Sequence, residues 1–92
     1  MESSTKRRTG AGDTSELIET IRRAIEQAIP CSRAEVTPGV GPGHFNVTVR
    51  SSSFAGQAMV QAHRLVYSAI AHLMRGDRPL VHAIDLLRAL SC

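Results

Sequence analysis

The sequence has few aromatic residues and no long apolar run. Phe45, Phe54 and Tyr67 are its only aromatic side chains, and tryptophan is absent. A hydrophobic core must therefore be aliphatic, and few side chains are available to stack on nucleic-acid bases. No stretch reaches the roughly 18 consecutive apolar residues of a transmembrane helix, so we expect no membrane partner.

Cysteine is also scarce. Cys31 and Cys92 are far apart, and neither belongs to a CxxC motif or a Cys/His cluster, which excludes a disulfide framework and a structural zinc site. Isolated thiols fit a reducing compartment, so we expect a cytoplasmic protein, with the mitochondrion and the nucleus as alternatives. The sequence has no paired carboxylates and no Ser or Cys nucleophile beside a base, and we therefore expect no enzyme.

The positive charge is modest. Eleven Lys and Arg residues against eight acidic residues give a net charge of +3, less than the dense basic stripe typical of nucleic-acid-binding proteins. Residues 1–13 have almost no apolar content and predict a flexible tail, in which the basic run at 6–8 is interpreted as solvent-exposed. Residues 14–90 predict one small domain.

Apolar periodicity predicts a first helix that ends before Pro30. Asp13 and Glu16 have the spacing of a capping box at its start. Glu19 and Arg23, four residues apart, predict an ion pair on its exposed side.

A second, longer helix is predicted to follow the serines at 51–53 and to reach about Met74, with Gly76 as its C-cap. Apolar residues at helical spacing predict one buried stripe on this helix. The stripe comprises Met59, Val60, His63, Val66, Tyr67, Ile70 and Leu73.

Two strands separated by a glycine-rich loop are predicted between these helices. Apolar and polar residues alternate over 44–50, the period of a half-buried strand, and 33–37 could form its antiparallel partner. The segment 80–90 fits either a helix or a strand. A two-stranded sheet is marginal alone, which favours a third strand.

Four motifs in this order resemble the BolA family. They are HFNVTV at 44–49, FAG at 54–56, VQAHRLVY at 60–67 and VHAI at 81–84. The resemblance covers residues 15–87. It implies an α/β (α+β) fold of the class II KH-like type, with the order helix, two strands, helix, strand and with helices on one face of a three-stranded sheet. It therefore assigns 80–87 to the third strand.

The resemblance also implies an adaptor function in iron–sulfur cluster maturation or iron homeostasis. BolA proteins pair with monothiol glutaredoxins, and a bridged 2Fe–2S cluster is shared with the glutaredoxin and glutathione. The family pattern assigns one iron ligand to the histidine that is His82 here. His63, Arg64 and Cys31 are expected to contact the partner. The isolated chain is expected to be a monomer without cofactor.

The chain departs from the family pattern at two places. Ala62 replaces a usual basic or polar residue, which would remove one cation from the presumed ligand face. Residues 32–43 contain neither the Cys nor the His that the family loop often supplies, so the second protein ligand stays open. A module that binds its partner without metal is therefore a further alternative.

The residues alone also allow simpler roles. His82 could be a partly buried strand histidine, His63 a histidine at the edge of the core, and Arg64 a solvated helix residue. His44 and His72 are interpreted as surface residues. The alternative function is a KH-like nucleic-acid-binding transcriptional regulator that uses Arg64 and Arg50, although the chain lacks the G-x-x-G loop with which KH domains clamp RNA.

Overall fold

The computed structural model describes residues 14–77 and 79–91 and confirms the predicted order of helix, two strands, helix and strand. The predicted tail at 1–13 and the Asp13 cap lie outside these residues. The elements are α1 (Thr14–Ala28), β1 (Ser32–Pro38), β2 (His44–Ser51), the 3-10 helix η3 (Ser52–Phe54), α2 (Met59–Ile70), the 3-10 helix η4 (Ala71–Leu73) and β3 (Ala83–Leu90).

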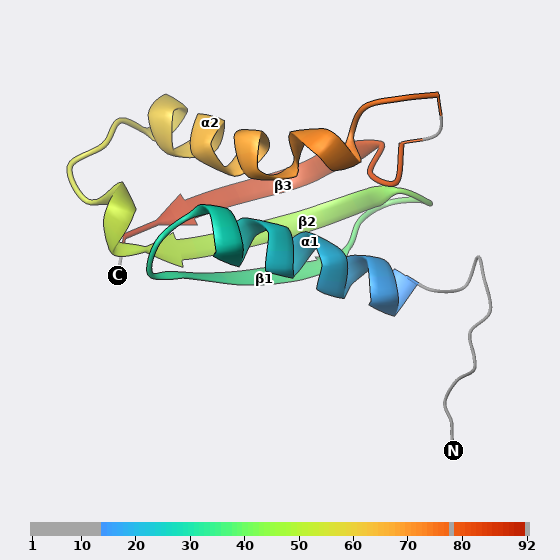
Figure 1. Ribbon diagram of the computed structural model, residues 1–92, viewed down its shortest axis with the longest axis horizontal. Helices are drawn as coiled ribbons and strands as arrows, with labels where there is room; N and C mark the ends of the chain where they lie inside the picture. The colour runs from blue at the N-terminus through green and yellow to red at the C-terminus, as the bar shows by residue number, and fades with distance from the viewer. Residues whose placement is uncertain (1–13, 78, 92) are drawn as a thin grey trace, which may run out of the picture.

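The three strands form one sheet with β2 in the centre (Figure 1). β1 runs antiparallel to β2, with Ser32 opposite Ser51 and Pro38 opposite Phe45. β3 runs parallel to β2, which requires a crossover connection, and α2 lies in that crossover. Both helices contribute to one core on the same face of the sheet, as the resemblance implied.

The core is one aliphatic cluster between this face and the helices. Phe45, Val47 and Val49 of β2 are at most 2% exposed, which confirms the predicted alternation. Ile21 and Ile25 of α1 are fully buried against them. Burial of each such side chain contributes about 1.5–3 kcal/mol relative to exposure.

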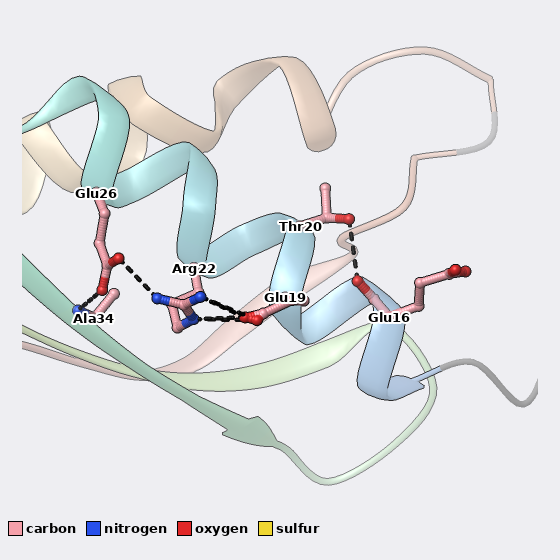
Figure 2. Close-up of polar contacts among 6 residues, drawn as sticks. All are labelled: Glu16, Glu19, Thr20, Arg22, Glu26 and Ala34. Carbon is pink, nitrogen blue, oxygen red and sulfur yellow. Dashed lines mark hydrogen bonds and ion pairs between the residues drawn. The ribbon is translucent and has the colours of Figure 1, made fainter. Parts of the chain in front are cut away.

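Arg22 forms ion pairs with Glu19 and Glu26 along one side of α1, and neither is the predicted pair (Figure 2). Nε of Arg22 donates to Oε2 of Glu19 at 2.8 Å, and its Nη1 donates to Oε1 of Glu26 at 2.7 Å. The other oxygen of Glu26 accepts from the backbone N–H of Ala34 in β1 at 2.9 Å. The predicted pairing of Glu19 with Arg23 is wrong. Arg22 lies three residues after Glu19 and four before Glu26, so it can pair with both.

The buried face of α2 also differs from the prediction. Val66, Ile70 and Leu73 are buried as expected, but Met59 is 73% exposed and Tyr67 is 40% exposed. Two alanines complete the buried face. Its members are Ala62, Val66, Ala69, Ile70 and Leu73. Because alanine is small, α2 packs closely on the sheet. The larger apolar residues Met59 and Tyr67 lie outside this contact.

The boundaries around α2 and β3 correct three further predictions. The α-helix begins at Met59, after the separate turn η3, and ends at Ile70 rather than near residue 74. Gly76 has a left-handed backbone, with φ +97°, but it lies beyond η4 and does not cap α2. The third strand is confirmed but begins at Ala83, because the N–H of Val81 donates to the carbonyl of Leu73 instead of pairing with β2. Neither described helix has the length and apolarity that crossing a membrane requires.

Candidate functional site

His82 lies at the end of the sheet, where the β1–β2 loop passes the start of β3. Its backbone N–H donates to the carbonyl oxygen of Gly43 at 2.8 Å, and the N–H of Ala83 donates to the same oxygen at 3.2 Å. Val81, the residue before His82 in the chain, is fully buried. The backbone of His82 is therefore anchored, while its side chain is exposed. A partly buried strand histidine, the simpler interpretation of the sequence, is not what the structure shows.

Gly43 is required for this arrangement. Its φ of +76° is in the left-handed region, where side chains with a Cβ are strained. A Cβ built at this position would lie only 2.8 Å from Cγ of His82. The absence of a side chain therefore lets the histidine ring approach the loop backbone closely, and the loop limits the positions that the ring can take.

Asp85 holds the same loop from β3. Its Oδ1 accepts from Nδ1 of His44 at 2.8 Å, and its Oδ2 accepts from the backbone N–H of Val40 at 2.8 Å. The hydrogen bond from His44, followed by that from Val40, lowers the pKa of Asp85. An ionised carboxylate therefore joins the start of β2 to the loop that carries Gly43.

His82 could serve as a metal ligand only as part of a larger set. Within residues 14–77 and 79–91, no three His, Cys, Asp or Glu side chains gather closely enough to hold a metal ion. An exposed neutral imidazole is nevertheless a good ligand for iron. The donor set of the described residues thus fits a metal group whose remaining ligands come from other molecules.

The structure does not bring His63 and Arg64 to His82. Both lie on the first half of α2, where His63 is half-buried and Arg64 is exposed. Leu73 accepts a hydrogen bond from Val81, the residue before His82. His63 is ten residues before Leu73, a separation of about 15 Å along a helix. His63 is therefore not held beside His82, and its expected contact with the partner stays a prediction. Ala62 is 3% exposed and packs in the core, so this position does not belong to a ligand face.

Cys31 and Arg50 lie at the other end of the sheet. Cys31 is exposed, with a φ of +55°, in the turn between α1 and β1, and the first residue of β1 pairs with the last residue of β2. Arg50 is on the face of the sheet opposite the helices, whereas Arg64 is on α2. The structure therefore groups neither Cys31 with His82 nor Arg50 with Arg64.

The pair of His44 and Asp85 was not found from the sequence, where His44 was interpreted as a surface residue. Asp85 can reach His44 because the β2–β3 register shifts between Phe45 and Asn46, so that Asp85 stands outside the regular pairing. Such a bulge depends on the meeting of two distant segments. The presence of a histidine at a strand start was the only local signal.

Comparison with known proteins identifies the chain's relatives. The family model "BolA-like protein" matches residues 23–89. BolA-like protein 1 of Pongo abelii and that of Homo sapiens are 35% and 34% identical to this chain in alignments of 85 residues, and each alignment covers 84% of this chain and 60% of the relative. The chain thus covers 60% of the length of these relatives.

Solved structures show the same fold. A bolA protein homologue from Coxiella burnetii has a TM-score of 0.61 and 32% identity, covering 79% of this chain and 87% of that one. BolA1 from Mus musculus has a TM-score of 0.69 and 28% identity, covering 99% of this chain and 77% of that one. The family-model match over 23–89 contains β1, β2, α2, the loop that supports His82, and all of β3 except its last residue. The chain belongs to the BolA-like protein family.

Proposed function

We propose that this chain is an adaptor that binds a monothiol glutaredoxin and shares a bridged 2Fe–2S cluster with it, as a step in iron–sulfur cluster maturation or iron homeostasis. One observation carries the proposal: His82 presents an exposed imidazole on a backbone that the Gly43 carbonyl and the buried Val81 hold in place. Membership of the BolA-like family supports it.

The role of His82 would be to provide one neutral nitrogen ligand. Replacement of a thiolate by neutral histidine reduces the negative charge of a 2Fe–2S cluster and raises its reduction potential. Glutaredoxin and glutathione thiolates would complete the ligand set. Gly43, together with the hydrogen bonds that Asp85 accepts from Val40 and His44, would keep the ring of His82 oriented before the partner binds.

The proposal is tested by titration of the full chain into a cluster-loaded monothiol glutaredoxin with glutathione. Visible absorption and circular dichroism are followed for the wild type, for His82→Ala and for His72→Ala. His72 is also an exposed histidine, but it lies in η4, and it provides the matched control. We expect a new spectrum that saturates near one chain per glutaredoxin in the wild type and in His72→Ala only.

Two results would contradict the proposal in different ways. A complex that forms without spectral change would show a partner-binding module that shares no metal. If no complex forms, the glutaredoxin partnership itself is wrong. The nucleic-acid alternative has less support than the adaptor function, since Arg50 and Arg64 lie on different sides of the sheet and cannot contact one short ligand together.

A further inference from the structure

The face of the sheet opposite the helices, called the open face below, carries three arginines. The strand register arranges its side chains in rows across the sheet. Arg33 is directly opposite Arg50, and Arg50 pairs in turn with Leu90. The next rows along the sheet are Glu35, Thr48 and Arg88, followed by Thr37, Asn46 and Leu86.

The pairing of Arg33 with Arg50 is unfavourable for folding. Cβ atoms of directly opposed residues in an antiparallel pair lie only about 4.5–5.5 Å apart, and like charges at that separation destabilise the sheet. Within the described ranges, neither arginine forms an ion pair, and neither does Arg88. In the described fold, the positive charges of both arginines are therefore left available to an acidic partner.

The surface around this pair is hollowed. A depression of about 250 Å³ is lined by Arg33, Ala34, Glu35, Thr48 and Arg50. Arginine guanidinium groups bind carboxylates in a two-pronged geometry, and a single acidic side chain fits a depression of this size. On β3, Arg88 lies between Leu86, which is 53% exposed, and Leu90 on the same face. Charged and apolar contacts are thus available side by side.

We propose that the open face binds an acidic, leucine-containing segment of a protein partner, with a carboxylate held between Arg33 and Arg50. Arg88 would bind a second carboxylate, and Leu86 and Leu90 would contact the apolar side chains between the acidic ones. Protein interfaces are enriched in arginine and exclude water through neighbouring apolar contacts, which is the composition found here.

The same features disfavour a nucleic acid as the ligand. The open face has no aromatic side chain in its three rows, so no base could stack on it. Three arginines would also neutralise far fewer phosphates than the roughly 6–10 contacts of a strongly salt-dependent DNA-binding protein.

The test uses the full chain and a defined probe, the end-blocked peptide Glu-Leu-Glu-Glu-Leu-Glu. Binding is followed by amide chemical shifts for the wild type, for R33Q/R50Q and for R23Q/R75Q. The last variant removes the same number of charges from exposed arginines elsewhere and is the matched control. We expect shifts confined to 33–35, 48–50 and 86–90, an affinity about tenfold lower in R33Q/R50Q, and little change in the control.

Folding is checked separately, since removal of the opposed charges should raise the Tm of R33Q/R50Q by a few degrees. Equal weakening in both variants would overturn the proposal, because net charge alone would then explain binding. Absence of peptide binding, shifts centred on the helices, or tighter binding of a short DNA duplex to the same residues would overturn it as well. None of these results bears on His82 and the glutaredoxin.

Discussion

Among single residues, Gly43 has the closest connection to the candidate site. We predict that Gly43→Ala destabilises the fold by at least about 1–2 kcal/mol, the usual cost of a left-handed backbone with a side chain. The added Cβ would also collide with Cγ of His82 and displace the ring. The free energy of unfolding in urea measures the first effect, and the ring resonances of His82 measure the second.

Gly41 in the same loop is the control for this prediction. A Cβ at this position meets no atom within 4 Å, so Gly41→Ala should unfold at nearly the wild-type denaturant concentration. The role assigned to Gly43 would be refuted by equal stability of the two variants together with unchanged His82 resonances.

The site could be predicted from the sequence only in part. His82 was found because it belongs to a short motif, and the structure places it at an exposed, anchored position. The sequence motifs do not show that His63 lies about 15 Å along the helix from Leu73, or that Cys31 lies at the opposite end of β1 from the His82 site. The hydrogen bonds of Asp85 to His44 and Val40 depend on a bulge that forms only when β3 pairs with β2.

At the level of secondary-structure elements, α2 depends on small residues in its buried face. Ala62 is 3% exposed, and a larger side chain would force the helix away from the sheet. We predict that Ala62→Leu costs about 1–3 kcal/mol of stability, the usual effect of overpacking. Gln61→Leu, at the exposed neighbouring position, places the same leucine side chain outside the core. Thermal unfolding should therefore occur well below the wild-type temperature for the first variant only.

The ion pairs of α1 predict a specific pH dependence of stability. The hydrogen bond from Arg22 lowers the pKa of Glu19 from its ordinary value of 4.5. The stabilising contribution is therefore complete above the unfolded-state pKa and is lost as the pH falls through the lowered folded-state pKa. Between about pH 6 and pH 3, the wild type should lose more unfolding free energy than Arg22→Gln.

Arg23→Gln is the control for this prediction, because Arg23 is adjacent but forms none of the ion pairs found within the described residues. It should keep most of the acid sensitivity of the wild type. Identical pH profiles for the wild type and Arg22→Gln would show that Glu19 gains nothing from this contact.

The elements differ in how far the sequence determines them. β2 was predicted correctly because its alternation of buried and exposed residues is a local pattern. The start of β3 was placed three residues early, because the contact between Val81 and Leu73 joins two segments through the fold. The buried face of α2 was misplaced because alanines carry little apolar signal, although close packing on the sheet favours them.

Across the whole molecule, His82 and the pair of Arg33 and Arg50 lie at opposite ends of the same sheet. His82 contacts Gly43 just before β2 begins, and Arg50 is six residues beyond His44. At about 3.3 Å per residue, the separation along β2 is about 20 Å. This distance exceeds the range over which exposed charges interact at physiological salt, which is about 8 Å.

We therefore predict that His82 and the pair of Arg33 and Arg50 act independently in binding. His82→Ala should abolish the spectral change with cluster-loaded glutaredoxin and leave the affinity for the acidic peptide unchanged, whereas R33Q/R50Q should do the reverse. The variant with all three substitutions should show the sum of the two effects, since substitutions this far apart without shared partners are usually additive. Both titrations on the same four proteins measure this. If R33Q/R50Q also weakened the glutaredoxin complex, the partner would have to reach from the β1–β2 loop along the whole sheet, and the open face would belong to the same interface as His82.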